Sequence, residues 1–328
     1  MNVRRAANGA RTRTDARSHS LALLTVGALL LPALFLSLGA TDAQAEVLYG
    51  VVPAAGGTNS MLVTVDLSDG STSTVGLIGA GGVTGLAFAD HDTLYGITIN
   101  RLLVIDPDTG AGDLSAFPGS VFGSPVYDIS IRPSDGTIFG VTFVSEAPAS
   151  NLGTIDTAIG LFAPFASDTS FGQQGEGNGL AFLSDDTLYN ASGLAFPDII
   201  PGFPPIGSSN LLLLDDSNGT GAFVATITDS GTNKLLGGYT SMAAAADDTL
   251  FASRSFEPPP FSTTPEEHSF VTIDQAGVVT PIGDTTAGLD GLAFRPAGAC
   301  PEPTAVLLQL AALTSLLVVK RHGRSRET

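Results

Sequence analysis

The sequence is short of the residues on which many enzyme sites depend. It contains no tryptophan, one cysteine and four histidines, and only His91 and His268 lie in its central part. The single cysteine, Cys300, has no partner for an internal disulfide. No zinc-binding H-x-x-x-H or C-x-x-C pair and no G-x-S-x-G nucleophile motif occurs. We expect both central histidines in solvated loops, and the sequence predicts that the chain is not an enzyme.

Basic side chains are scarce as well. Residues 46–300 hold 28 acidic and five basic side chains, a net charge of −23, compared with −18 for the whole chain. The five basic residues are Arg101, Arg132, Lys234, Arg254 and Arg295. Such a negative field repels nucleic acid and anionic lipid, which excludes DNA or RNA as a partner. The apolar content of the same region is too high for a disordered chain and predicts a folded domain.

The first 45 residues have the order of a secretory signal. Five arginines come first, the apolar run Leu21–Leu38 follows, and Ala43-Gln44-Ala45 offers a small-x-small cleavage site. We therefore predict a signal peptide at 1–45, cut after Ala45, and a mature domain at 46–298. The apolar run is long for a signal peptide, so an uncleaved N-terminal anchor is the alternative.

The last 30 residues, 299–328, form a three-part tail. Pro301-Glu302-Pro303 is rigid and extended, because each proline fixes φ and restricts the residue before it. The apolar run 304–319 then predicts a short transmembrane helix of about 24 Å. A basic end follows, which should stay cytoplasmic. Cys300 is expected to be an incidental linker residue, with lipid attachment or a mixed disulfide as alternatives.

This tail resembles the PEP-CTERM sorting signal of Gram-negative bacteria. The Pro-Glu-Pro motif, the apolar helix and the arginine-rich end are all present, and only Gln309 departs from the pattern. The resemblance implies that an exosortase in the inner membrane binds the tail, cuts near Pro301–Pro303 and releases the protein to the cell surface or matrix. A plain C-terminal membrane anchor is the alternative.

Three short patterns recur five times each between the two signals. A small apolar segment, an aromatic strand and a strand ending in Asp follow one another every 40 to 62 residues. The apolar segments begin at Gly85, Tyr127, Gly179, Tyr239 and Gly291; the aromatic residues are Tyr95, Phe139, Tyr189, Phe251 and, at the start, Tyr49; and the final aspartates are Asp66, Asp106, Asp156, Asp215 and Asp274. A weaker fourth strand follows each of these aspartates, and Asp- and Gly-rich hairpin turns join the strands.

A unit of four short antiparallel strands with this period resembles a β-propeller blade. We predict an all-β fold of five four-stranded blades, with the small apolar segments lining the centre. The mature chain begins with a second strand and ends with a first strand, so the two ends should complete one blade and close the ring. Six blades are the alternative if 187–249 holds two units. The absence of tryptophan disfavours WD40 repeats.

Loop length is expected to vary at one place only, between the second and third strands. These loops are long in the fourth unit, 193–209, and in the fifth, 256–268. They emerge on one face and carry Phe196, Phe203, Phe256 and Phe261 beside several prolines, which stiffen a loop for recognition. We predict a face that binds a glycan or protein partner, with tolerated surface insertions as the alternative.

Metal sites have weak support in the sequence. Asp106, Asp108 and Asp113 place three carboxylates within one turn, but the spacing misses the full calcium loop. The prediction is therefore no cofactor, with calcium left open at these residues. Only two acids, Asp128 and Asp290, fall in the segments expected at the centre.

Two functions follow from these observations. The main hypothesis is an exported, non-enzymatic binding or scaffold module, which the PEP-CTERM resemblance associates with exopolysaccharide and biofilm matrix. The alternative is a secreted, metal-dependent propeller hydrolase similar to lactonases. A ring of inward carboxylates around one metal ion would favour the second hypothesis.

Overall fold

The computed structural model describes residues 46–118, 121–123, 125–144, 149–165, 178–192, 209–230, 238–256 and 267–297. These residues belong to one compact unit, 45–298. The predicted signal peptide (1–45) and sorting tail (299–328) lie outside the described residues. Within the described ranges, no helix has the length and apolar character needed to span a membrane.

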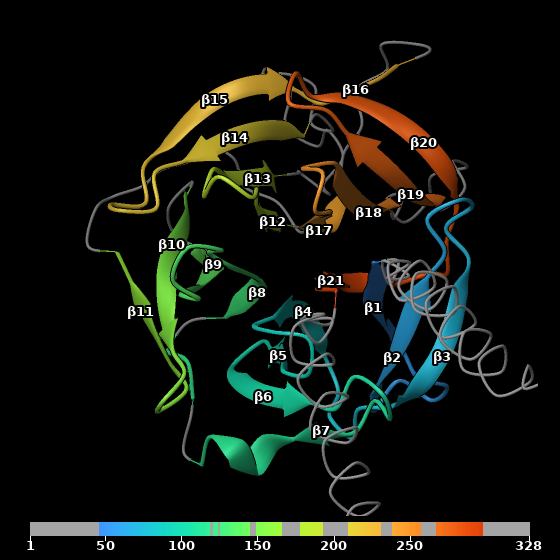
Figure 1. Cartoon of the computed structure of the whole chain (residues 1–328), viewed down its shortest axis with the longest axis vertical. Coiled ribbons are helices and arrows are strands. Elements are labelled where there is room, and N and C mark those ends of the chain that lie inside the picture. The colour runs from blue at the N-terminus through green and yellow to red at the C-terminus, as the bar shows by residue number, and fades with distance from the viewer. Residues whose placement is uncertain are drawn as a thin grey trace, which may run out of the picture. The chain divides into compact units, whose positions relative to one another are not determined.

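The described strands form five antiparallel sheets arranged around a common centre (Figure 1). From the innermost strand outwards, blade 1 consists of β21 (Asp290–Arg295), β1 (Val47–Pro53), β2 (Ser60–Val65) and β3 (Thr72–Leu77), blade 2 of β4 (Val83–Phe88), β5 (Leu94–Thr98), β6 (Arg101–Ile105) and β7 (Gly112–Asp113), and blade 3 of β8 (Val126–Ile131), β9 (Ile138–Val144), β10 (Ala149–Asp156) and β11 (Leu161–Pro164). The predicted five-bladed β-propeller is confirmed.

Blades 4 and 5 include the stretch 187–249, in which a sixth blade was the alternative. Blade 4 consists of β12 (Asn178–Phe182), β13 (Leu188–Ser192), β14 (Asn210–Leu214) and β15 (Gly221–Thr226), and blade 5 of β17 (Tyr239–Ala244), β18 (Leu250–Phe256), β19 (Glu267–Ile273) and β20 (Val278–Asp284). A short strand, β16 (Thr228–Asp229), adds a parallel edge to β20. The described part of 187–249 therefore contributes the three outer strands of blade 4, the edge strand β16 and the inner strand of blade 5.

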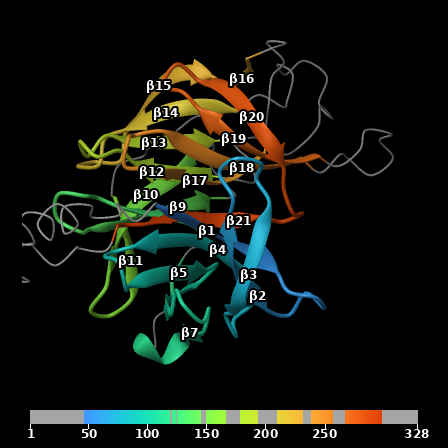
Figure 2. The same ribbon diagram turned by 45° about the vertical axis from the view of Figure 1, so that its right-hand side comes forward.

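The two ends of the domain close the ring as predicted. β21 pairs with β1, with Val47 opposite Arg295 and Leu48 opposite Phe294 (Figure 2). β1 in turn pairs with β2. The pairing of the first and last strands of the domain satisfies backbone N–H and C=O groups that would otherwise be exposed at a sheet edge. It therefore removes a template for aggregation.

Apolar side chains fill the spaces between neighbouring blades. Aromatic residues on second strands meet phenylalanines on the inner strand of the next blade: the ring centroids are 5.3 Å apart for Tyr49 and Phe88, 5.1 Å for Phe139 and Phe182, and 5.5 Å for Phe251 and Phe294. All three pairs meet edge to face, the arrangement that aromatic quadrupoles favour. The repeated aromatic residues in the sequence thus mark blade interfaces.

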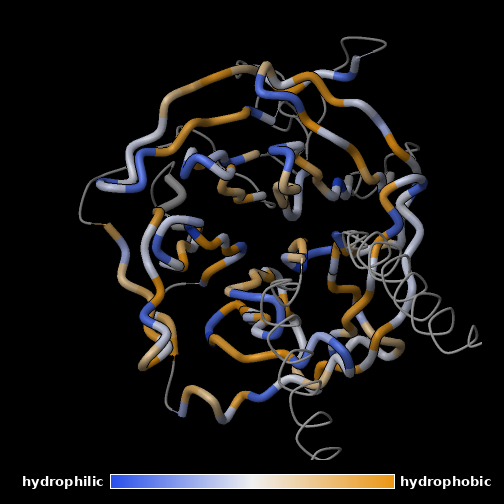
Figure 3. The backbone as a smooth tube through the Cα atoms, viewed as in Figure 1, coloured by the Kyte–Doolittle hydropathy of each residue, from blue (hydrophilic) through white to orange (hydrophobic). Residues whose placement is uncertain are grey.

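Hydrophilic residues fall mainly at the turns between strands (Figure 3). The aspartate that ends each third strand makes a local turn: Asp66 Oδ1 accepts the Ser68 N–H at 2.8 Å, and Gly70 follows with φ +76°. Asp106, Asp156, Asp215 and Asp274 accept from the backbone two residues later in the same way. These bonds explain why strands end at the recurring aspartates.

One expectation about the loops is wrong. The connections between blades also vary in length, since five residues join β3 to β4 but twelve, including the 3₁₀ turn η1 (Leu114–Ala116), join β7 to β8. A connection on the outside of a blade is as free to lengthen as a hairpin, because neither changes the packing between blades.

Candidate functional site

The five inner strands present equivalent positions to the centre of the ring. The Gly-Leu-Ala-Phe segments of blades 1, 2 and 4 align with Asp128–Ile131 of β8 and Ser241–Ala244 of β17. The first position of this alignment is buried in all five blades, and we call it the central belt. It consists of Gly85, Asp128, Gly179, Ser241 and Gly291.

Glycine is needed in the belt because the inner strands approach one another closely. A Cβ added at Gly85 would lie 3.0 Å from the Cα of Asp128, and one added at Gly179 would lie 2.8 Å from the Cβ of Met242. Both neighbours belong to the next blade. The buried belt therefore separates the central channel into two mouths.

Asp128 is the one large side chain in the belt, and it joins four blades. Its Oδ2 accepts the Leu180 N–H of blade 4 at 2.9 Å and lies 3.2 Å from the Ser241 hydroxyl, which donates from blade 5. Ser241 Oγ accepts the Leu292 N–H of blade 1 at 2.7 Å. Burial raises the pKa of Asp128 well above its usual range, against the lowering effect of the Leu180 N–H. Asp128 is thus a structural clamp across the centre.

The position before the belt forms a polar mouth. Thr84, Tyr127, Thr240 and Asp290 occupy it in four blades, and each is partly exposed, although the residues on either side are buried. In blade 4 the same register position is Asn178, whose side chain lies outside the described part of the chain. This mouth opens on the face from which the loops between second and third strands emerge, because antiparallel strands bring those ends together.

Asp290 gives the polar mouth an ionisable group. Its Oδ1 accepts the Gly291 N–H at 3.0 Å, and its deep position raises the pKa of the carboxyl well above its usual range through desolvation. The residue still keeps part of its surface accessible. An accessible carboxyl with a raised pKa is suited to take up and return a proton.

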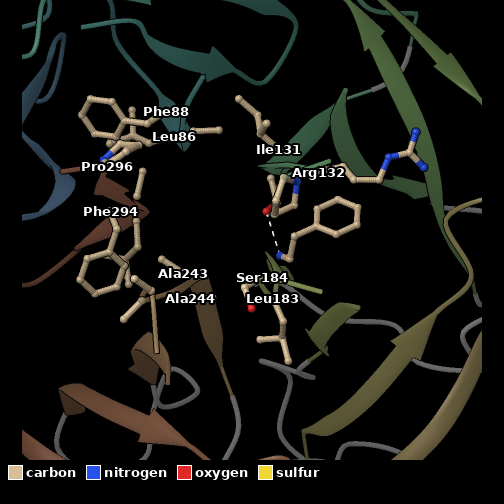
Figure 4. Close-up of a pocket in the computed structure, with 18 of the residues that line it drawn as sticks. Leu86, Phe88, Ile131, Arg132, Leu183, Ser184, Ala243, Ala244, Phe294 and Pro296 are labelled. Carbon is tan, nitrogen blue, oxygen red and sulfur yellow. Dashed lines mark hydrogen bonds between the residues drawn. The ribbon is translucent and has the colours of Figure 1, made fainter. Parts of the chain in front are cut away.

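The opposite mouth is apolar. It contains a cavity of about 360 Å³ whose walls come from all five inner strands, including Leu86, Ile131, Ala244 and Phe294 (Figure 4). The turns between first and second strands surround it, with Ser184 at its edge. The two mouths thus differ in chemistry: among the described residues, Asp290 is the acid on an inner strand at the polar mouth, whereas the cavity is lined mainly by apolar side chains, with Glu46 in its lining.

The described residues do not fit a metal centre. Asp106 Oδ1 accepts the Asp108 and Thr109 N–H groups, Asp113 Oδ1 accepts the Ser115 N–H, and Asp108 Oδ1 lies 2.7 Å from Arg295. These carboxylates therefore serve the turns and an ion pair rather than calcium. In the described ranges, no group of three or more His, Cys, Asp or Glu side chains lies close enough to hold a metal.

The inward acids do not supply a metal centre either. Both carboxylate oxygens of Asp128 are already hydrogen-bonded, Oδ1 to the Ile129 N–H and Oδ2 to blades 4 and 5. Among the described inner strands, Asp290 is then the one acid left, whereas calcium takes six to eight oxygen ligands.

The structure describes the two central histidines but not the side chains of the predicted binding face. Phe256 ends β18, but its side chain and the whole of Phe196, Phe203 and Phe261 lie outside the described residues, so the binding face stays a prediction. His91 lies in a turn beside Asp92, as expected. The solvated loop expected for His268 is wrong: this residue lies in β19, and its Nδ1 is 3.0 Å from Ser255 Oγ. The cross-strand pairing of Ser255 with His268 explains that contact.

The described domain is a closed five-bladed β-propeller with one polar and one apolar mouth. Neither a family model nor a curated protein matches the chain. Solved structures do match. They include gluconolactonase XC5397 from Xanthomonas campestris (14% identity, 75% of this chain and 78% of that chain, TM-score 0.42), a chain of a nidogen/laminin complex (14%, 78% and 87%, 0.42), and the PQQ-bound aldose sugar dehydrogenase from Streptomyces coelicolor (14%, 73% and 72%, 0.39).

One expectation is corrected by these comparisons. The sequence predicts that the chain is not an enzyme, and this prediction is corrected, because two of the three solved structures named above are described as enzymes. At such low identity the likeness itself shows the fold alone. The chemistry must be argued from this chain's own residues, and the polar mouth is where an acid faces the channel.

Proposed function

We propose that the chain is an exported propeller hydrolase that acts at the polar mouth on small polyhydroxylated esters, such as sugar lactones. The observation that carries the proposal is Asp290, a partly exposed carboxyl with a raised pKa at the centre of the ring. Hydroxyl-bearing residues, Thr84, Tyr127 and Thr240, occupy the same position in other blades. Hydroxyl groups both donate and accept hydrogen bonds, which suits a polyol substrate.

A single carboxyl group is sufficient for the proton transfers of ester hydrolysis. As a water oxygen attacks the ester carbonyl carbon, the Asp290 carboxylate takes a proton from that water. The bond from this carbon to the ring oxygen then breaks, and Asp290 returns the proton to the leaving oxygen. The product is an open-chain hydroxy acid, and the carboxylate is regenerated. The hydroxyls of the mouth bind the substrate, while Asp128 holds the inner strands in place beneath it.

The proposal also includes the cellular location of the protein. The signal at 1–45 and the tail at 299–328 support export, processing by an exosortase, and a location at the cell surface or in the matrix of a Gram-negative bacterium. A glycan or matrix protein as partner would then meet the face that carries the long loops. Hydrolysis of sugar-derived esters is compatible with a location at the cell surface or in the matrix.

The test is hydrolysis of glucono-1,5-lactone and related δ-lactones, followed by proton release above the uncatalysed rate. Asp290→Asn should lower kcat by about 100-fold or more, the usual contribution of a positioned acid or base. Because the pKa of Asp290 is raised, wild-type kcat should fall as the pH drops through a value above the usual range of Asp. Chelation with EDTA should leave the rate unchanged.

The matched control is Asp284→Asn, which removes an exposed acid of β20 and should keep wild-type activity. Circular dichroism establishes that both variants are folded. Undiminished hydrolysis by the Asp290 variant, or no hydrolysis of any tested lactone by the wild type, would overturn the proposal. Loss of activity on chelation would show that a metal is required.

A further inference from the structure

The apolar mouth is a second candidate site, independent of the hydrolysis proposed at the polar mouth. The buried belt lies between the two mouths, so a ligand in one does not reach the other. The cavity of about 360 Å³ is more than twice the size of a cavity that holds benzene, about 150 Å³. An aromatic ring with a substituent therefore fits.

Two blades depart from the aromatic pattern beside this cavity. Phe88, Phe182 and Phe294 end the aligned segment in blades 2, 4 and 1, whereas the same position is Ile131 in blade 3 and the much smaller Ala244 in blade 5. The alanines Ala243–Ala246 line the cavity from that side. A phenylalanine at position 244 would occupy space that is open in this structure, which makes Ala244 the natural place to block it.

Carboxylates surround this mouth. Eight acidic residues lie in the turns between first and second strands and at the start of β1: Glu46, Asp90, Asp92, Asp135, Asp185, Asp186, Asp247 and Asp248. The two arginines near them already hold carboxylates, since Arg132 lies 2.6 Å from both Asp135 and Asp216, and Arg295 lies 2.7 Å from Asp108. The negative field at the mouth attracts cations and opposes anions.

The apolar floor and the acidic rim together define the chemistry of the occupant. We propose that the apolar mouth binds an amphipathic organic cation, with its apolar body in the cavity and its ammonium group at the rim. Phe294 lines the cavity and provides an aromatic surface of the kind that attracts ammonium groups. The negative rim disfavours an anionic ligand of the same size, and the mainly apolar floor offers few ligands to a metal ion.

The test compares benzyltrimethylammonium with benzoate by isothermal titration calorimetry. At low salt the cation should bind at least tenfold more tightly than the anion, and the difference should shrink at 0.5 M salt, where charges are screened. Equal affinity for the two probes, or no saturable binding of the cation, would overturn the proposal.

Two variants locate the site. Ala244→Phe should abolish binding, whereas Ala222→Phe, on the exposed outer strand β15, should bind as the wild type does. Asp247→Asn keeps the side-chain oxygen that accepts the Thr249 N–H, so the turn is preserved, and it should weaken the cation alone. Wild-type binding by the Ala244 variant would overturn the location, and an unchanged cation preference in the Asp247 variant would overturn the role of the rim.

Discussion

At the scale of single residues, two aspartates show why a strained backbone is retained. Asp186 and Asp248 have positive φ angles of 69° and 65°, in equivalent turns where blade 3 has Gly136 at 74°. Asp186 Oδ1 accepts the Ser134 N–H from blade 3 at 3.0 Å. Asp248 accepts the N–H of Ser184 at 2.7 Å and its hydroxyl at 2.9 Å, both from blade 4. The carboxylates join neighbouring blades, a role that glycine cannot fill.

Asp248→Gly tests this balance. Glycine relieves about 1 kcal/mol of backbone strain but removes two exposed hydrogen bonds, each worth about 1–1.5 kcal/mol. We expect a net loss of about 1–2 kcal/mol in the free energy of unfolding, measured by urea denaturation. Ser184→Ala, which removes only the hydroxyl bond, should cost less. Stability equal to that of the wild type in the glycine variant would contradict the role of the carboxylate.

At the scale of elements, the inner strands pack through their glycines rather than through large side chains. Neighbouring inner strands lie so close at Gly85 and Gly179 that even an added Cβ would come within 3.0 Å of the next blade. Asp128 is accommodated in place of a glycine because its carboxylate accepts hydrogen bonds from three neighbouring groups. The distance between inner strands therefore depends on a few positions, one in each blade. Changing one of them should disturb two blades.

Gly179→Ala is the corresponding variant. Its added Cβ would lie 2.8 Å from the Met242 Cβ, which is closer than two carbons tolerate, so β12 and β17 must move apart. We expect a loss of about 1–3 kcal/mol, as for other overpacked cores. The control is Gly123→Ala, where nothing lies within 4 Å of the added Cβ. Similar urea midpoints for the two variants would argue against close packing in the belt.

At the scale of the whole molecule, ring closure sets where the chain can be cut. Glu46 is the first residue after the predicted signal peptide, and its two carboxylate oxygens accept the Ala246 N–H at 3.0 and 3.2 Å. β1 then pairs with β21, which ends at Arg295. A chain that starts at Glu46 therefore keeps every strand of blade 1.

Intact mass spectrometry of the protein from its native host tests the predicted processing. We expect a released species that starts near Glu46 and ends near Pro301. The membrane and released fractions are measured separately. A membrane-bound species that still ends at Thr328 would contradict sorting by an exosortase, and a species that starts at Met1 would contradict cleavage of the signal.

Part of the candidate site can be recognised in the sequence. The residue before each belt position is polar in all five units, and Thr84, Asn178 and Asp290 directly precede Gly-Leu-Ala-Phe. These five equivalent positions form the polar mouth. The chemistry of the acids was harder to predict, because Asp128 and Asp290 look alike in sequence, whereas one is sealed in the belt and the other reaches solvent.

The sequence by itself determined the four-strand unit, the Asp turns and the closure of the ring, because hairpins form between neighbouring segments through local hydrogen bonds and alternating side chains. Only the tertiary structure decided which residues meet between blades. Asp128 bonds Leu180 and Ser241, 52 and 113 residues away. Such contacts depend on how five separate sheets pack around one axis, and so do the burial that separates the two mouths and the pKa of Asp290.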